Sequence, residues 1–309
     1  MAIERKKTEH KDKVVFLLGP TAVGKSFFAI KMAQIFDGEI ISADSVQVFK
    51  GLDIGSAKIT KDEMQGVVHY GIDICKPCED FSAYEFAQFT KKKIKEISQR
   101  GKLPIVVGGT GLYIKALTQG FNFGGVEKDE SLRLKLQKIA KEQGNDALFE
   151  MLKKQNPEVA KNIDRFNTVR LVRALEIALS QGEKRASEVE IDPLVIALDM
   201  DRAKLYERIN LRVDEMLQSG LVDEVKRLKE SGLNESHQSM HAIGYKEVLQ
   251  FLDEKLTYDE MTNLIKQHTR NYAKRQWTFL RKMDCTFVNV ENRDETLKQI
   301  EKMVKEFLK

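Results

Sequence analysis

Short apolar runs alternate with amphipathic stretches along the first third of the chain. This alternation is typical of βαβ units, in which strands of a parallel sheet are joined by helices. The elements predicted from it are, in order, a strand at Val14 to Leu18, a helix at Gly24 to Phe36, a strand at Glu39 to Ser42, a helix from the capping box of Ser82 and Glu85 to Arg100, and a strand at Leu103 to Val107.

The pattern changes after Gly120, where the neighbouring Gly124 and Gly125 indicate a break. From Asp129 to Gln181 the apolar residues recur at helical spacing, without a strand pattern. The later segments predict a strand at Leu194 to Leu198, helices at Asp201 to Lys229 and at Tyr258 to Lys282, a strand at Cys285 to Val290 and a final helix. We therefore predict an α/β core of residues 1–120 and 191–309, interrupted by a helical insertion at residues 121–190.

Composition narrows the class of protein. Of the 309 residues, 42% are hydrophobic and 32% charged, which is typical of a soluble globular chain with a substantial core. Each apolar run is far shorter than the roughly 20 residues that cross a bilayer, so no membrane span is expected. The charged segment Met1 to Lys13 lacks the apolar region of a secretory signal, and three cysteines favour a reducing cytoplasm over a disulfide framework. A monomer is the default expectation.

A phosphate-binding motif lies between the first predicted strand and helix. Its residues are Gly19, Pro20, Thr21, Ala22, Val23, Gly24, Lys25 and Ser26, which match G-x-x-x-x-G-K-[ST]. Inward-pointing backbone N–H groups, the helix amino terminus and the Lys25 ammonium together suit a di- or triphosphate, and Ser26 would hold Mg²⁺ or a phosphate oxygen. The motif indicates a P-loop-type doubly wound parallel sheet, but it leaves open which group transfer is catalysed.

Three charged side chains are candidates for chemistry beside this loop. Asp44 follows the second predicted strand, where a carboxylate can hold Mg²⁺ or accept a proton; alternatively, it caps a turn. Arg208 and Arg212 lie four residues apart on one face of a predicted helix. They could contact a diphosphate or nucleic-acid phosphates, or else pair with acids such as Glu215.

A basic helix near the carboxyl terminus is a candidate for binding RNA. Met261 to Met283 contains no acidic residue. Its basic side chains recur on one helical face around an aromatic residue, and the set comprises Lys266, Arg270, Lys274, Trp277 and Arg281. A basic stripe of this kind suits phosphate contacts and base stacking, although many charged faces are simply solvated.

Several longer motifs, taken together, resemble the tRNA dimethylallyltransferases, also called tRNA isopentenyltransferases. They are GPTAVGKS at 19–26, ISADSVQVFKGLDIGSAK at 41–58, VGGTGLYIKAL at 107–117, RLVRALE at 170–176, RINLRV at 208–213, HAIGYKE at 241–247 and TRNYAKRQ at 269–276. The resemblance covers about residues 14 to 282, nearly the whole chain.

The resemblance implies transfer of a dimethylallyl group from dimethylallyl diphosphate to N6 of the adenosine 3′ of the anticodon, with Mg²⁺ as cofactor and pyrophosphate released. The phosphate loop, Arg208 and Arg212 would then hold the diphosphate. Asp44 would be the general base, Thr110 would contact the bridging oxygen, and Gln47 would orient the flipped adenine. The residues expected to contact the tRNA anticodon stem-loop are Asp44, Ser45, Val46, Gln47, Thr110, Val169, Arg170, Leu171, Val172, Arg173, Arg270, Lys274, Arg275 and Trp277.

Two other classes of protein remain as alternatives. A P-loop kinase of a nucleotide or small metabolite accounts equally well for residues 14–60, with Asp44 activating the acceptor, but it leaves the later motifs unexplained. A non-catalytic RNA-binding protein accounts for the basic helix, but it gives no reason for Asp44 and Thr110.

Overall fold

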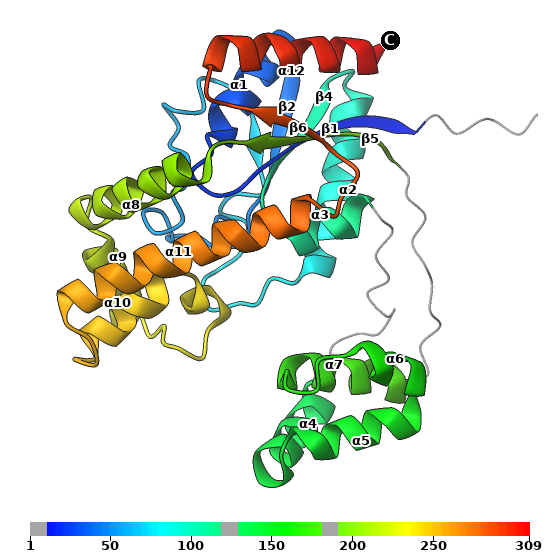
Figure 1. The fold of residues 1–309 in the computed structure, drawn as a ribbon, viewed down its shortest axis with the longest axis vertical. Coiled ribbons are helices and arrows are strands. Elements are labelled where there is room, and N and C mark those ends of the chain that lie inside the picture. The colour runs from blue at the N-terminus through cyan, green and yellow to red at the C-terminus, as the bar shows by residue number, and fades with distance from the viewer. Residues whose placement is uncertain (1–10, 119–128, 181–190) are drawn as a thin grey trace, which may run out of the picture. The chain divides into compact units, whose positions relative to one another are not determined.

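The protein consists of two compact units in the computed structural model, which describes residues 11–118, 129–180 and 191–309. The core unit comprises residues 1–119 and 189–309, and the helical unit comprises residues 120–188. Figure 1 shows the helices and strands of both units and marks the carboxyl terminus. The predicted break at Gly124 and Gly125 and both ends of the predicted insertion lie outside the described residues.

The core unit is built on a sheet of six strands in the order β3-β2-β4-β1-β5-β6, and every pairing between neighbours is parallel. The strands are β1 (Asp12–Leu18), β2 (Gly38–Ala43), β3 (His69–Tyr70), β4 (Leu103–Gly108), β5 (Ile191–Asp199) and β6 (Thr286–Asn289). The predicted α/β fold with a parallel sheet is confirmed. The two-residue strand β3 was not predicted, because so short a segment carries no periodic pattern.

Helices cover both faces of this sheet. Figure 1 shows α1 (Lys25–Ile35) and α12 (Arg293–Leu308) on one face, with α2 (Ala83–Gln99) and α3 (Gly111–Thr118) on the other. Side chains alternate between the faces of a strand, so Val15 and Leu17 of the central strand β1 pack toward α1 and α12. Because β1 is covered on both sides, its sequence is a continuous apolar run and not an alternating one.

The remaining helices of the core unit form a layer beside the carboxyl ends of the strands. They are α8 (Arg202–Gln218), α9 (Leu221–Glu230), the 3₁₀ turn at Gln238–His241, α10 (Tyr245–Leu252) and α11 (Tyr258–Leu280). The prediction of one continuous helix from Asp201 to Lys229 is wrong. Gly220, with φ 97°, adopts a left-handed conformation that ends α8 and starts α9.

The helical unit contains α4 (Glu130–Gln143), α5 (Asn145–Gln155), α6 (Pro157–Asn162) and α7 (Thr168–Leu179). Leucines from α4, α5 and α7 form its small core. A buried carboxylate, Glu176, accepts hydrogen bonds from Arg133 and from the backbone N–H of Asp129. The unit therefore has its own apolar core and its own buried ion pair.

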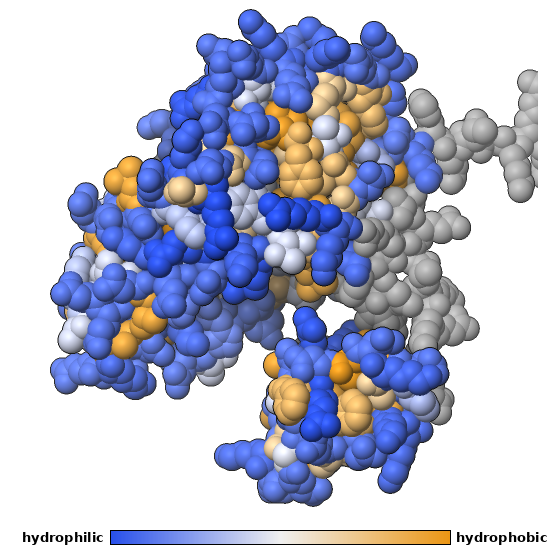
Figure 2. Space-filling view, viewed as in Figure 1, coloured by the Kyte–Doolittle hydropathy of each residue, from blue (hydrophilic) through white to orange (hydrophobic). Residues whose placement is uncertain are grey.

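The surface of the core unit is mainly hydrophilic on the face shown in Figure 2, and a large group of hydrophobic side chains shows between α12 and α11. No helix among the described residues combines the length and the hydropathy that crossing a bilayer requires.

Candidate active site

The phosphate loop joins β1 to α1 at the carboxyl end of the sheet. Its tight path depends on glycine: Gly24 has φ 102°, and a methyl group at Gly19 would lie 2.8 Å from Val23 Cγ1 and 3.0 Å from the carbonyl oxygen of Leu198. The Lys25 Nζ atom donates hydrogen bonds to the carbonyl oxygens of Gly19 (3.1 Å) and Pro20 (2.8 Å). The loop thus has the backbone geometry expected of a phosphate cup.

Lys25 has an unusually low pKa. Burial lowers the pKa of its ammonium to about 8, with the nearby Asp44 carboxylate opposing that shift and the Arg212 guanidinium adding to it. Perturbed cations of this kind are typical of sites that receive a charged ligand.

Arg208 and Arg212 of α8 both face the phosphate loop. A methyl group at Gly24 would lie 3.7 Å from the Arg208 Nη2 atom. Burial lowers the pKa of Arg212, and Arg208 lowers it further. Within residues 11–118, 129–180 and 191–309 neither guanidinium makes an ion pair, so the alternative pairing with Glu215 is not adopted. Three cations therefore converge where a polyphosphate would be bound.

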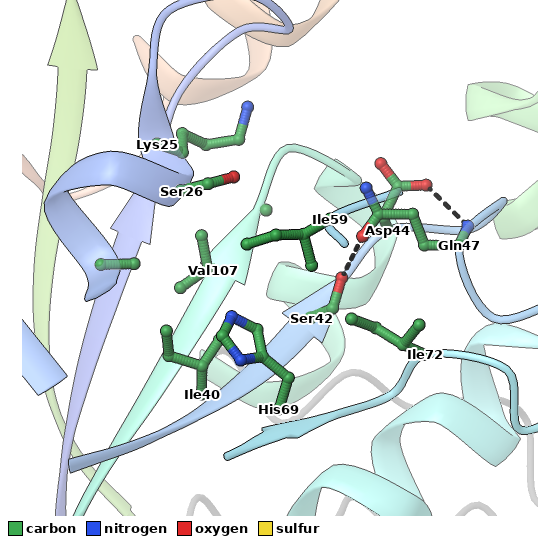
Figure 3. A pocket seen from close by; sticks show the side chains of 12 residues that line it. Lys25, Ser26, Ile40, Ser42, Asp44, Gln47, Ile59, His69, Ile72 and Val107 are labelled. Carbon is green, nitrogen blue, oxygen red and sulfur yellow. Dashed lines mark hydrogen bonds between the residues drawn. The ribbon is translucent and has the colours of Figure 1, made fainter. Parts of the chain in front are cut away.

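Asp44 follows β2 and faces the phosphate loop across a small cavity. Figure 3 shows it beside Gln47, with Lys25 and Ser26 of α1 around the same cavity. Its Oδ1 atom accepts hydrogen bonds from the backbone N–H groups of Val46 (2.8 Å) and Gln47 (3.3 Å). Its Oδ2 atom has no hydrogen-bond partner in the described chain. Asp44 therefore caps a turn and still presents one free oxygen, so the two interpretations are compatible.

Gln47 has both ends of its amide engaged. Its Oε1 atom accepts from the Ser42 hydroxyl (3.0 Å), and its Nε2 atom donates to the carbonyl oxygens of Ser56 and Ala57 (3.3 Å each). Figure 3 shows the bond to Ser42. These contacts fix the segment that follows Asp44 to the loop at 53–58, while the predicted contact of Gln47 with adenine stays a prediction.

Glu224 holds that loop from the other side and was missed by the sequence analysis. Its buried carboxylate accepts hydrogen bonds from the backbone N–H groups of Asp53 (3.1 Å), Ile54 (2.8 Å) and Gly55 (3.2 Å), and from the Tyr245 hydroxyl (2.7 Å). A signal was available, because Glu224 shares the apolar face of α9 with neighbouring buried side chains. An acid in such a position needs partners.

Thr110 lies directly after β4, in a glycine-rich turn that begins α3. Its Oγ1 atom is buried and makes no hydrogen bond of good geometry among the described residues, although it lies close enough to the Tyr272 hydroxyl to lower the pKa of that group. A buried hydroxyl so weakly engaged can donate to a ligand.

A cavity of about 280 Å³ opens beside Asp44. Polar groups on its wall include Asp44, Arg212 and Tyr272. Burial and the Asp44 charge raise the pKa of Tyr272 to about 12, so its hydroxyl stays protonated at neutral pH. Apolar side chains on the same wall include Ile209, Val213, Met216, Ile243 and Ile265. The cavity can therefore take an uncharged hydrocarbon or an aromatic base next to the polar cup.

The basic residues of α11 divide into two groups. Lys266 forms an ion pair with Asp214 (2.6 Å), and Arg270 donates to the Asn210 side chain (2.6 Å), so these two tie α11 to α8. Lys274 and Arg275 are exposed, and Arg275 lines the 280 Å³ cavity. Lys274 and Arg281 of the predicted stripe are thus exposed and available to a polyanion, as is Arg275, which was predicted as a tRNA contact outside the stripe.

Trp277 is not on that surface. It is 7% exposed and packs in the main core, and its Nε1 atom donates a 2.6 Å hydrogen bond to Asp199 Oδ1. The prediction that it stacks on RNA is wrong, because the helix turns this side chain toward the sheet and not toward solvent.

The tRNA contacts predicted on α7 need a similar correction. Leu171 and Val172 are buried in the core of the helical unit, so their side chains are unavailable. Arg173 forms an ion pair with the buried Glu176. Val169, 78% exposed, and the exposed Arg170 remain accessible.

Comparisons with known proteins agree on one family. The family model described as IPP transferase matches residues 47–283. A tRNA dimethylallyltransferase of Oceanobacillus iheyensis is 45% identical over 91% of this chain and 92% of its own.

Solved structures agree as well. The tRNA isopentenylpyrophosphate transferase of Bacillus halodurans is 41% identical, with a TM-score of 0.75 over 96% of this chain and 97% of that one. A eukaryotic dimethylallyltransferase acting on tRNA is 30% identical, with a TM-score of 0.78 over 90% of this chain and 74% of that one.

Proposed function

The chain belongs to the tRNA dimethylallyltransferase family, and on this basis we propose that it transfers the dimethylallyl group of dimethylallyl diphosphate to N6 of the adenosine 3′ of the anticodon in tRNAs. One observation carries the proposal: Lys25 and Arg212 at the phosphate loop and the free oxygen of Asp44 border two neighbouring cavities, the larger of which also has several apolar side chains on its wall. An anionic leaving group, a hydrocarbon and a nucleophile awaiting deprotonation would each find a matching environment there.

In this reaction the N6 nitrogen attacks C1 of the dimethylallyl group, and the C1–O bond breaks with its electron pair leaving on pyrophosphate. Lys25, Arg208, Arg212 and the loop amides stabilise the charge that grows on the leaving group. Thr110 donates its buried hydroxyl to the bridging oxygen, and the free oxygen of Asp44 accepts the proton from N6.

The site fits Mg²⁺. The exposed Ser26 hydroxyl lines the same cavity as Asp44, and hydroxyl and carboxylate oxygens are ligands that this ion prefers. Ser26 would hold the ion, which when bound neutralises part of the diphosphate charge.

The acceptor base must leave its stack to reach this site, so the tRNA has to present a flipped adenine. Arg275, which lines the cavity, and the exposed Lys274 next to it would bind the flanking phosphates, while Arg170 and Val169 offer a contact on the helical unit. Location in the cytoplasm stays a prediction from composition, and the monomer stays a default expectation.

The experiment incubates the purified protein and Mg²⁺ with unmodified tRNA and labelled dimethylallyl diphosphate, with a parallel arm containing ATP labelled in its terminal phosphate. Label from the prenyl donor on adenosine is the expected result. Label from ATP alone would overturn the proposal in favour of the kinase alternative.

A further inference from the structure

Gln276 of α11 lies between the two loops that would hold the leaving group. The residue is 6% exposed. Its Oε1 atom accepts a 2.8 Å hydrogen bond from the backbone N–H of Thr21, and its Nε2 atom donates a 3.1 Å hydrogen bond to the carbonyl oxygen of Gly109. One side-chain amide thus joins the phosphate loop to the turn after β4.

The contact leaves no spare room. A methyl group at Gly109 would lie 2.1 Å from Gln276 Nε2 and 2.8 Å from the carbonyl oxygen of Gly19. The backbone at Gly109 is therefore packed against both the amide and the phosphate loop. The next residue is Thr110, so any shift of Gly109 moves the Thr110 hydroxyl relative to the cup.

A neutral amide satisfies both loops at once at neutral pH, because it carries a donor and an acceptor at the same end. A carboxylate would keep the bond to Thr21 and lose the one to Gly109. The residue that follows, Trp277, is fixed by its bond to Asp199, so α11 holds the amide in place.

We propose that Gln276 is a positioning residue that sets the separation between the diphosphate cup and Thr110, and so aligns the bridging oxygen of the leaving group with that hydroxyl. The inference rests on the proposed function. Its consequence is that Gln276 acts on the chemical step and leaves tRNA binding unchanged, because a small misplacement of a catalytic group lowers the rate steeply.

The test compares Gln276→Leu, which keeps the side-chain volume and removes both bonds, with Gln267→Leu, a change at an exposed glutamine on the same helix. Single-turnover prenyl transfer at saturating tRNA and donor should fall by about tenfold or more in the first variant, with tRNA affinity within about twofold of wild type. The control variant should match wild type in both.

Gln276→Glu gives a signature that a purely structural role would lack. Its rate, relative to wild type at the same pH, should recover as the pH falls and the carboxyl gains a proton that it can donate to Gly109. This variant also carries the test if Gln276→Leu fails to fold.

The proposal would be overturned if Gln276→Leu transferred the prenyl group at the wild-type rate. It would also be overturned if the fall in rate were accompanied by an equal fold-loss of tRNA affinity and by a lower thermal midpoint of unfolding. Failure of the proposed function is separable: wild-type protein would then transfer no prenyl group. Binding of inorganic pyrophosphate would still test whether Gln276 positions the phosphate loop, since Gln276→Leu should weaken pyrophosphate binding and Gln267→Leu should not.

Discussion

Asp44→Asn separates the two roles that the structure gives this side chain. The Oδ1 atom of aspartate caps the turn by accepting from Val46 and Gln47, and an asparagine oxygen can accept the same two bonds. The substitution therefore removes the charge and basicity while keeping the turn. Asp44→Ala removes both, and losing two hydrogen bonds of about 0.5–1.5 kcal/mol each should lower the free energy of unfolding by about 1–3 kcal/mol.

The expected effect on rate follows from the free Oδ2 atom. Loss of a general base costs about 10²–10⁴-fold, which corresponds to about 2.7–5.4 kcal/mol in the activation free energy. Single-turnover transfer of labelled dimethylallyl to tRNA should therefore fall by that factor in both variants, with tRNA affinity nearly intact. Only the alanine variant should also unfold more easily. Asp62→Asn, at an exposed site, controls for the loss of one negative charge.

A second readout comes from the charge of Asp44. Its carboxylate raises the pKa of Lys25 against the effect of burial. In Asp44→Asn the pKa of Lys25 should thus lie below its wild-type value of about 8, and pyrophosphate affinity should begin to fall at a lower pH. The reasoning is refuted if Asp44→Asn keeps the wild-type rate, or if tRNA affinity falls as far as the rate does.

The other predictions concern Lys25, the exposed end of α11, and Trp277. Wild-type affinity for pyrophosphate should fall as the pH rises through about 8, because the Lys25 ammonium loses its proton there. Lys25→Met should bind pyrophosphate weakly at every pH, without this dependence. A wild-type affinity that does not change with pH would contradict the prediction. Replacing Lys274 and Arg275 by glutamine should weaken tRNA binding and reduce the slope of log affinity against log salt by about 1.4–1.8, whereas an unchanged slope would make both residues merely solvated. Trp277→Phe should lower the free energy of unfolding by about 1–3 kcal/mol through loss of the bond to Asp199 and leave tRNA affinity unchanged; weaker tRNA binding at unchanged stability would restore a stacking role.

The sequence by itself determined the features whose signal is local. The first strand, the phosphate loop and the first helix follow one another within Val14 to Phe36. The buried apolar run, the turn and the start of the helix can therefore each be recognised from adjacent residues. The capping box of Ser82 and Glu85 was also predicted correctly, because a cap joins residues three positions apart. Alternation of such elements was enough for the parallel α/β class.

Only the tertiary structure decided which face of each helix is covered. Periodicity placed Lys274 and Trp277 near one another on α11, but it could not show that the indole packs on the sheet while the ammonium faces solvent. Leu171 and Val172 were placed at the tRNA contact by resemblance, although they fill the core of their own unit.

For the same reason, the sequence did not predict the residues that shape the site from distant positions in the chain. Gln276 reaches Thr21 across 255 positions, and Glu224 reaches Asp53 across 171. Such contacts leave no periodic or spacing signal, since they depend on how α9 and α11 pack beside the sheet. Residue order therefore fixed the chemistry of the phosphate loop, and packing between distant segments fixed the geometry in which that chemistry can be used.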